Sequence, residues 1–457
     1  MGEHYSFFKA YDVRGRVPEE LNPDIAYRIA RAYAEFIRPD SVVLGRDMRL
    51  SSSGLCDALA QGFTESGVNV IDIGLCGTEE VYFATFDRGA GGGIMVTASH
   101  NPANYNGFKF VREGARPLSS DSGLGEIEAL AATHEYPRQA ATGRRKAADT
   151  RPDYVRWLLK QIDVSALKPL RIVVDAGNGC AGLVVDALAS HLPFEFIRLH
   201  HEPDGTFPNG VPNPLLPQNR LATSRAVREQ GADFAVAWDG DFDRCFLYDE
   251  RGEFIEGYYI VGLIAQSLLA QHPGEKIVHD PRLVWNTLDI VKAAGGLPVQ
   301  TKAGHAFIKE RMRVENAIYG GEMSAHHYFR DFAYCDNGTL PWLLVAQLLS
   351  VSGRSLSALV EDRIRQFPAS GEINREVSDP DAVLKAVEAR YASEAGSVEY
   401  VDGLSMDCGD WRFNLRKSNT EPVVRLNVEA RDDIALMQVK TAEILALLAS
   451  LGAREAH

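Results

Sequence analysis

Short apolar runs alternate with longer amphipathic stretches along the first three quarters of the chain. In the first series, β-rich runs at residues 41–44 and 68–73 flank a helix-like stretch at 54–67. The same order returns at residues 171–199 and again at 276–300. Strand, helix, strand in this order predicts a mostly parallel sheet covered by helices. We therefore expect three similar α/β units.

Each series is followed by one more apolar strand that runs into a polar loop. These strands are expected at residues 93–96, 234–238 and 317–319. In open α/β sheets, ligands bind beyond the carboxyl ends of the strands. The three loops that follow are therefore the first candidates for catalytic or ligand-binding residues.

The last ninety or so residues break this pattern and predict an α+β domain. Strands are expected at 371–377, 411–415 and 423–430, and helices at 379–391 and 434–451. Residues 139–149 are small, polar and basic without an apolar period, which is typical of a linker. The resulting fold class is three similar α/β domains with mixed sheets, at 1–145, 150–250 and 251–367, plus a C-terminal α+β domain at 368–457.

Composition narrows the function classes. The 457 residues include 48 Lys and Arg and 62 Asp and Glu, a net charge of −14. That charge argues against a generally basic nucleic-acid binder and leaves a small anionic substrate open. The six cysteines form no CxxC or Cys/His spacing, which argues against a zinc site or a disulfide framework.

No membrane or export signal is evident in the sequence. The N-terminus lacks the apolar stretch of a secretory signal. The longest apolar helical stretches, at 258–270 and 442–449, fall short of the ~20 residues that span a membrane. We expect a soluble, cytoplasmic protein that binds neither membrane nor nucleic acid.

Ser99 stands in the first polar loop, Thr97-Ala98-Ser99-His100-Asn101-Pro102. A serine beside Asn-Pro is often only a turn residue. A hydrolase nucleophile is disfavoured because the GxSxG motif is absent. The sharper interpretation is a phosphoryl-accepting serine, with Lys109 able to turn back and stabilise the phosphate charge.

The second loop, Asp239-Gly240-Asp241-Phe242-Asp243-Arg244, places three carboxylates at alternate positions. Their mutual repulsion calls for a counter-charge. An EF-hand is excluded because its sixth position, here Arg244, requires glycine, and because strands rather than helices flank the loop. We predict a Mg²⁺ site with open coordination positions, with a solvated acidic turn as the alternative.

Two further loops carry polar patterns. In extended chain, Glu322, Ser324 and His326 would point to one side and suit the vicinal hydroxyls of a sugar, although an ordinary polar strand end fits equally well. Arg416-Lys417-Ser418-Asn419-Thr420-Glu421-Pro422, with Arg425 after it, predicts either a phosphate clamp or a basic hairpin turn.

A glycine motif leaves a different enzyme class open. Gly177-Asn178-Gly179-Cys180-Ala181-Gly182 fits GxGxxG after a strand, with Glu202 about twenty residues on, as in dinucleotide-binding proteins. The other two units lack these glycines. A tight turn with close packing is the preferred interpretation, and a dehydrogenase remains an alternative.

Together these loops resemble the α-D-phosphohexomutase family, in the order that the family uses and over almost the whole chain. The matching motifs are Thr97–Pro102 with Tyr105-Asn106-Gly107-Phe108-Lys109, then Asp239–Arg244, Gly321–His326 and Arg416–Pro422. The resemblance implies four domains around a central cleft. It also implies a phosphoserine at Ser99, and Mg²⁺ held by Asp239, Asp241, Asp243 and a phosphoserine oxygen.

The resemblance assigns the remaining roles residue by residue. Glu322 and Ser324 would read the sugar hydroxyls, with His326 in the same loop. The residues implied to hold the non-reacting phosphate are Arg416, Ser418, Asn419, Thr420 and Arg425. The candidates for charge stabilisation and proton transfer are Arg14, Lys109, His305, His100 and Arg244. Arg282 stands where related enzymes often have lysine, and Ala325 replaces a more usual glycine.

The implied activity is a phosphomannomutase or phosphoglucomutase that interconverts hexose 6-phosphate and hexose 1-phosphate. A hexose 1,6-bisphosphate would be the intermediate and the activator. The alternatives are a phosphoglucosamine mutase, a sugar phosphatase that uses the same serine and metal, and a non-catalytic phosphosugar sensor. A monomer or a weak homodimer is expected. Mannose and glucose differ only at the 2-hydroxyl, so the sequence leaves that preference open.

Overall fold

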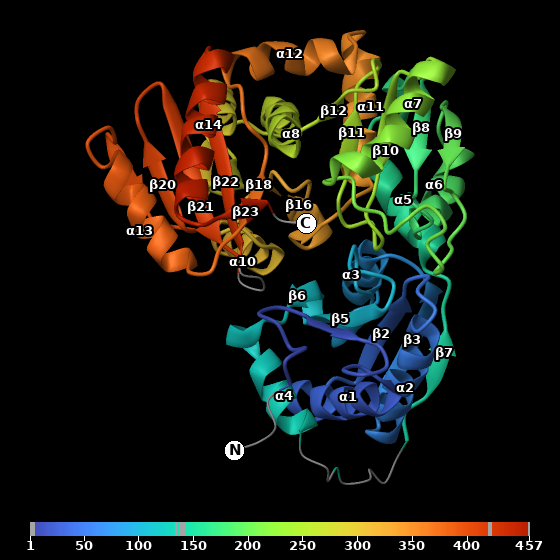
Figure 1. The fold of residues 1–457 in the computed structure, drawn as a ribbon. Coiled ribbons are helices and arrows are strands. Elements are labelled where there is room, and N and C mark those ends of the chain that lie inside the picture. The colour runs from blue at the N-terminus through green and yellow to red at the C-terminus, as the bar shows by residue number, and fades with distance from the viewer. Residues whose placement is uncertain (1–4, 133–135, 137–141, 419–422, 456–457) are drawn as a thin grey trace. The chain divides into compact units, whose positions relative to one another are not determined.

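The computed structural model describes residues 5–132, 136, 142–418 and 423–455. The chain separates into two compact units (Figure 1). Unit 1 comprises Met1–Phe254 and Asp331–Gly353, and unit 2 comprises Ile255–Arg330 and Arg354–His457. Residues 331–353 thus pack with unit 1, although they follow a strand of the third predicted series.

The first sheet of unit 1 contains the first predicted strand–helix–strand series. Its strands run in the order β1-β5-β4-β2-β3-β7, with β6 beside β5. The strands are β1 (Val13–Arg16), β2 (Ser41–Arg46), β3 (Asn69–Leu75), β4 (Gly92–Val96), β5 (Tyr105–Arg112), β6 (Arg116–Pro117) and β7 (Arg145–Ala147). The helices are α1 (Pro23–Ile37), α2 (Ser52–Glu65), α3 (Thr78–Asp87) and α4 (Leu124–Ala131). β2 pairs in parallel with both β3 and β4, as predicted.

Alternating side chains of β2 explain why helices cover both faces of this sheet. Val42 and Leu44 are buried in the cluster that includes residues of α1, α2 and α4. Val43 points to the opposite face and packs in the cluster that includes residues of α3. Successive side chains of a strand point to opposite faces, so a fully apolar strand requires two covered faces. Figure 1 shows α1 and α2 on one side of β2 and α3 on the other.

The expected linker at residues 139–149 is wrong for part of its length, and residues 139–141 of it lie outside the described residues. Residues 145–147 form β7, which pairs in parallel with β3 at the edge of the first sheet. The three side chains of β7 are exposed. An edge strand with both faces in water has no apolar period, so the hydrophobic pattern did not reveal it.

The second sheet of unit 1 repeats the parallel arrangement, in the order β12-β11-β10-β8-β9. Its strands are β8 (Arg171–Asp175), β9 (Glu195–Leu199), β10 (Phe234–Ala237), β11 (Phe246–Tyr248) and β12 (Phe254–Ile255). The remaining helices and strands of unit 1 are α5 (Arg151–Lys160), α6 (Ala181–Ala189), α7 (Leu221–Gln230), β17 (Cys335–Asp336) and α11 (Leu340–Ser352). β8 is parallel to both β9 and β10.

Unit 2 contains the third α/β sheet, with β14, β13, β15 and β16 in that order. Its elements are β13 (Lys276–His279), β14 (Leu297–Gln300), β15 (Tyr319–Gly321), β16 (His327–Phe329), α8 (Gly257–Gln271), α9 (Trp285–Ala293), α10 (His305–Glu315) and α12 (Leu356–Gln366). β13 is parallel to β14 and to β15, whereas β15 and β16 are antiparallel. The third predicted series is therefore confirmed.

The fourth sheet, also in unit 2, is antiparallel and has the order β19-β20-β21-β22-β18-β23. Its elements are β18 (Ile373–Glu376), α13 (Pro380–Tyr391), β19 (Ser397–Glu399), β20 (Leu404–Asp407), β21 (Trp411–Lys417), β22 (Val423–Ala430), α14 (Ile434–Ser450) and β23 (Arg454–Glu455). α13 and α14 pack their apolar side chains on this sheet, which is the predicted α+β arrangement.

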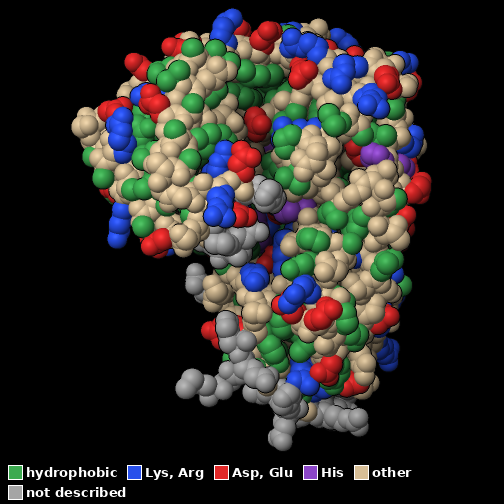
Figure 2. All heavy atoms as spheres, in the orientation of Figure 1, with side chains coloured by type: hydrophobic (Ala, Val, Ile, Leu, Met, Phe, Trp, Pro, Cys, Tyr) green, Lys and Arg blue, Asp and Glu red, His purple; other side chains and the backbone are tan. Residues whose placement is uncertain are grey.

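Within the described residues, no helix alone is long and apolar enough to cross a membrane, although the consecutive helices α11 and α12 pass that test as a pair. Most of the side chains of α11 are buried in the protein. All six cysteines are free thiols. Basic and acidic side chains are interspersed on the face shown in Figure 2.

Candidate active site

Ser99 lies just beyond the end of β4, in a backbone conformation that serine seldom adopts. Its φ is 47°, and its backbone N–H donates to Thr97 Oγ1 at 2.9 Å. The buried Ser99 hydroxyl donates to Asp239 Oδ2 at 2.7 Å and lies 3.0 Å from His100 Nδ1. Strained conformations of this kind cluster at functional sites, where the surrounding structure holds them. The loop after β4 and the loop after β10 therefore meet at this hydroxyl.

The three aspartates after β10, the aspartate cluster (Asp239, Asp241 and Asp243), are buried together around Lys109. Lys109, on β5, places its Nζ 2.6 Å from Asp241 Oδ2 and also donates to Asp243. Burial lowers the pKa of Lys109, but the charges of Asp241 and Asp243 raise it more, so the net shift is upward. Lys109 is thus a buried ammonium between two carboxylates.

The aspartate cluster fits a divalent cation. One carboxylate oxygen from each aspartate lies within 4.8 Å of the others, close enough to share one ion. Asp239 Oδ1 and Asp241 Oδ1 are buried and accept no hydrogen bond from the described residues. Hard carboxylate oxygens are the ligands that Mg²⁺ prefers. An ion would thus satisfy two oxygen atoms whose burial is otherwise unfavourable.

Three further predicted residues contact Ser99 itself, its loop or Asp239. Arg14, on β1, donates to Asp12 at 2.7 Å and to Asn101 Oδ1 at 2.6 Å, which ties it to the serine loop. Arg244 Nε lies 3.5 Å from Asp239 Oδ2. Burial and the nearby positive charge of Arg244 lower the pKa of His100 to about 4. His100 is therefore neutral at pH 7.

In unit 2, the predicted extended segment after β15 is wrong. β15 ends at Gly321, and Ala325 N–H donates back to Glu322 O at 3.0 Å, which closes a turn. Ala325 has φ 68°, a conformation that glycine adopts without cost, so the alanine at this position adds strain. Even so, Arg282 Nη2 reaches both Glu322 Oε1 at 3.3 Å and Ser324 Oγ at 3.2 Å.

The other predicted residues of this turn and its surroundings lie on neighbouring elements. His326 is buried and stacks on Tyr328, whose hydroxyl donates to Glu322 Oε2 at 2.6 Å. His305 begins α10, and the N–H of the preceding Gly304 donates to Glu322 Oε1 at 2.8 Å. Glu322 is therefore held in place from several directions.

The predicted phosphate clamp lies where β21 leads into β22. Arg416 and Arg425 are direct neighbours across these two strands. Ser418 donates its backbone N–H to Val423 O at 2.9 Å. Asn419 and Thr420 lie outside the described residues. Arg282, Arg416 and Arg425 together form the arginine cluster.

Comparisons with known proteins decide the family. Four models described as phosphoglucomutase/phosphomannomutase domains match in order: α/β/α domain I at residues 6–138, domain II at 152–252, domain III at 256–367 and the C-terminal domain at 372–446. The chain belongs to the phosphoglucomutase/phosphomannomutase family.

Individual relatives agree over nearly their full length. A phosphomannomutase of Salmonella montevideo is 61% identical over 450 residues, covering 97% of this chain and 99% of the relative. A protein of Xanthomonas campestris pv. campestris named phosphohexose mutases is 60% identical over 441 residues, covering 96% and 98%. The crystal structure of a phosphoglucomutase/phosphomannomutase family protein from Burkholderia thailandensis matches with a TM-score of 0.88 and 31% identity, covering 99% and 100%.

Membership of this family makes the chain a hexose phosphate mutase, an isomerase. The dehydrogenase alternative is wrong, and the glycine motif has a packing role. A Cβ on Gly182 would lie 2.4 Å from His201 O, and one on Gly179 would lie 2.9 Å from Gly240 O. Gly177 has φ 55°. These glycines allow the chain's own backbone to pack closely, as in the preferred interpretation.

Arg49, which was not predicted as a site residue, holds the serine loop together. Its guanidinium donates to the carbonyls of Ser99 at 2.8 Å, Asn101 at 2.6 Å, Pro102 at 2.7 Å and Tyr105 at 2.9 Å. The side chain is buried beside Asp47. The only signal in the sequence is a charged run after the strand at 41–44, which also fits a solvated turn.

Thr78 is a second missed residue, at the start of α3. Its hydroxyl donates to Asp241 Oδ2, and its N–H donates to Asp241 O at 3.1 Å. The first turn of a helix presents backbone N–H groups that favour a negative charge. Thr78 begins a helix that packs on the first sheet, and it thus orients one member of the aspartate cluster, which follows the second sheet of unit 1.

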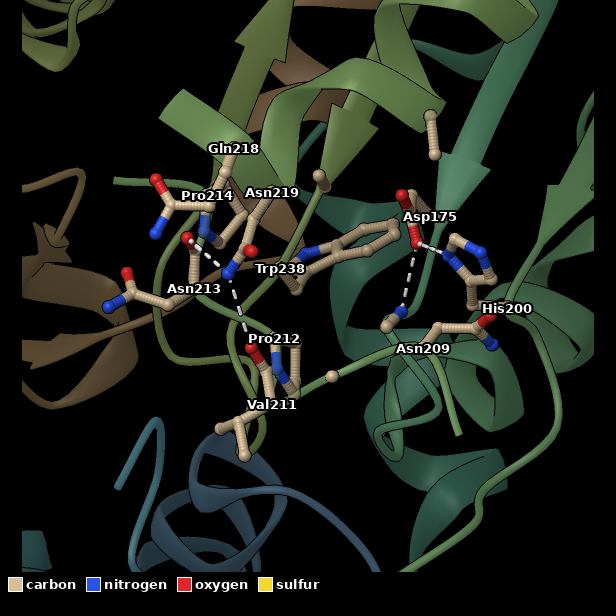
Figure 3. Close-up of a pocket in the computed structure, with 14 residues that line it drawn as sticks. Asp175, His200, Asn209, Val211, Pro212, Asn213, Pro214, Gln218, Asn219 and Trp238 are labelled. Atoms are coloured by element: carbon tan, nitrogen blue, oxygen red, sulfur yellow. Dashed lines mark hydrogen bonds and ion pairs between the residues drawn. The ribbon is translucent and has the colours of Figure 1, made fainter. Parts of the chain in front are cut away.

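A cavity of about 210 Å³ opens at the carboxyl ends of β8 and β10, beside the aspartate loop (Figure 3). Asp175 there accepts from Thr223 at 2.7 Å and lies 2.9 Å from His200 Nδ1. Asn219 donates to the carbonyls of Val211 and Asn213 (Figure 3). These groups pair with one another and so stabilise the loop that forms the cavity wall.

Proposed function

We propose that this mutase interconverts hexose 6-phosphates and hexose 1-phosphates of mannose and of glucose through a phosphoserine at Ser99. The observation that carries the proposal is the Ser99 hydroxyl hydrogen-bonded to Asp239, with Lys109 among the same aspartates. Phosphoryl transfer depends mainly on positioning and on charge stabilisation. A serine fixed beside carboxylates and cations meets both needs.

In this proposal, the aspartate cluster holds Mg²⁺ through Asp239, Asp241 and Asp243. The ion would supply positive charge to the phosphoryl oxygens. Lys109, Arg14 and Arg244 would add charge stabilisation, and the half-buried His100 could accept the serine proton. Ser99 would give its phosphoryl group to the substrate and recover the other phosphate from the hexose 1,6-bisphosphate, which would also serve as the activator.

Residues of unit 2 would recognise the sugar phosphate. Glu322 accepts hydrogen bonds, which suits sugar hydroxyls, and Ser324 can donate one. His326 and His305 would act beside them. Arg282, Arg416 and Arg425, with Ser418, Asn419 and Thr420, would bind the phosphate that does not react, because guanidinium groups match phosphate oxygens in geometry and charge.

The proposal extends to the molecule as a whole. We assign four domains at residues 1–145, 150–250, 251–367 and 368–457, a cytoplasmic location, and a monomer or weak homodimer. The Asp- and Glu-rich composition is compatible with a small phosphosugar substrate because the required cations are gathered locally.

The deciding experiment replaces Ser99. We expect Ser99→Ala to lose at least about a thousandfold in turnover of mannose 1-phosphate with glucose 1,6-bisphosphate present, since it removes the nucleophile. Intact-mass analysis should find one phosphoryl group on the wild type and none on the variant. Ser53→Ala, exposed on α2, is the matched control and should keep wild-type turnover. Full activity of Ser99→Ala would refute the proposal.

A further inference from the structure

Arg416 and Arg425 place two positive charges side by side in the fourth sheet. They form a direct cross-strand pair between β21 and β22. Like charges at such positions repel each other, so the pair requires a nearby anion. Arg282, which follows β13, brings a third guanidinium, and its side chain is 4% exposed. The protein must therefore neutralise this cluster whether or not a ligand is bound.

Glu372 is the anion that all three arginines share. Its carboxylate lies 3.1 Å from Arg416 Nη2, 3.3 Å from Arg425 Nη1 and 3.5 Å from Arg282 Nη1. The residue stands immediately before β18, whose neighbour in the sheet is β22. Burial raises the pKa of Glu372, but the charges of the arginines lower it more, so the net shift is downward. Glu372 is therefore ionised at neutral pH.

The cluster still has capacity for another anion. Among the described residues, the buried Nε of Arg416 has no hydrogen-bond partner. Asp280 and Glu322 also contact Arg282, so the three guanidinium groups face three carboxylates in all. Arg416 and Arg425, however, both contact the one carboxylate of Glu372, so this pair places two positive charges against one shared negative charge. A phosphate would take the guanidinium donors that now pair with Glu372. Because both anions would contact the same guanidinium groups, the phosphate and the Glu372 carboxylate would also lie close together and repel each other.

We propose that Glu372 is a positioning residue that acts as a resident counter-ion, competing with the sugar phosphate for the arginine cluster and limiting how tightly that phosphate is held. This inference rests on the proposed function, in which the cluster is the phosphate clamp. The limit on affinity has a use in that reaction. A bisphosphate intermediate has to present each of its phosphates in turn, and a clamp that held the first too tightly would slow the exchange.

The test is the isosteric variant Glu372→Gln, which keeps the shape and removes the competing charge. Calorimetric titration with inorganic phosphate should show about tenfold tighter binding than the wild type, the scale of one partly buried charge interaction. KM for mannose 1-phosphate should fall by a similar factor, and kcat should fall because release becomes slower. Glu376→Gln, exposed at the other end of β18, is the matched control and should leave both constants unchanged.

A purely structural counter-ion would give the opposite result. If Glu372→Gln left phosphate binding unchanged or weaker and raised KM, the inference would be overturned. If the glutamine variant does not fold, Glu372→Asp shortens the carboxylate by one methylene, and the same tightening of phosphate binding, smaller in size, is then expected. Loss of affinity in the aspartate variant would equally count against competition.

A third variant separates this inference from the proposed function. Arg416→Gln should weaken phosphate binding in the otherwise wild-type chain. If it does so while Glu372→Gln has no effect, the clamp stands and only the role of Glu372 fails. If Arg416→Gln leaves phosphate binding and KM unchanged, the assignment of the clamp itself is wrong.

Discussion

The aspartate cluster in unit 1 and the arginine cluster in unit 2 are electrostatic opposites built on the same plan. In the first, Lys109 lies between Asp241 and Asp243, and in the second, Glu372 lies among three arginines. In each cluster, one residue of the opposite sign contacts at least two of the like charges. Arg244 beside Asp239, and Asp280 and Glu322 beside Arg282, add further counter-charges. The difference in sign decides the ligand: a cation for the carboxylates and a phosphate for the guanidinium groups.

Burial differs between the two clusters as well. Asp241 and Lys109 have side chains that are 0% and 7% exposed, whereas Arg425 and Glu372 are 27% and 19% exposed. Charge interactions strengthen as water is excluded. Changes to the aspartate cluster should therefore have larger effects than changes to the arginine cluster, and the following variants test that order.

The largest effect is expected from removing a ligand of the proposed metal. Asp241→Asn should lower kcat by about a thousandfold, because it weakens both cation binding and charge stabilisation at the serine. A chelator should abolish wild-type turnover, and added Mg²⁺ should restore it. Asp233→Asn, on the loop before β10, is a control that should behave as wild type. Wild-type turnover in Asp241→Asn, or activity that survives the chelator, would contradict the metal assignment.

Removing the counter-ion of the aspartate cluster should mainly affect stability. Lys109→Met leaves buried carboxylates without their ammonium, which should lower the free energy of unfolding by about 3 kcal/mol in metal-free buffer. Added Mg²⁺ should stabilise this variant more than it stabilises the wild type. Urea denaturation with and without Mg²⁺ measures both effects, with Lys146→Met, exposed on β7, as control. Equal stabilisation by Mg²⁺ in both proteins would argue against a shared position for the ion and the ammonium.

The two clusters also differ in how well the sequence predicts them. The alternation of Asp239, Asp241 and Asp243 after an apolar strand is local, and the strand-end rule places it correctly. The hydrophobic pattern likewise predicts the parallel pairing of β2 with β3, β8 with β9 and β13 with β14. Local patterns of this kind are sufficient to predict helices and strands, and to predict a site whose residues all lie in one loop.

Residues that act across long sequence distances were missed. Glu372 joins β18 to arginines on β21, β22 and the loop after β13, and nothing in its neighbourhood marks it. Arg49 acts on carbonyls some fifty residues away. The turn at Glu322 was misread because its polar alternation fits an extended strand, while the positive φ of Ala325 has no signal in the residue type.

A smaller effect is expected where the serine loop is anchored. Arg49→Lys keeps the charge but loses the planar fork that donates to carbonyls of the loop. We expect kcat to fall about tenfold with KM nearly unchanged, since the loss is in the position of Ser99 and not in substrate binding. Steady-state kinetics check this, with Arg116→Lys, exposed on β6, as the control. A change confined to KM would show that Arg49 does not act through the serine.

The smallest effect is expected at acidic pH, where the stability that Glu372 contributes to the arginine cluster is lost. The pKa of Glu372 in the folded protein lies below its ordinary value of 4.5, because the arginines outweigh the effect of burial. A lowered pKa contributes stability that is present above pH 4.5 and is lost as the pH falls through the folded-state value. Between pH 5 and pH 3, the wild type should therefore lose about 1 kcal/mol more stability than Glu372→Gln, a modest figure because the pair is partly exposed. Thermal denaturation across this range measures the difference. If the stability of the two proteins fell in parallel with pH, the arginines would not stabilise the ionised carboxylate of Glu372. The two clusters would then resemble each other only in geometry.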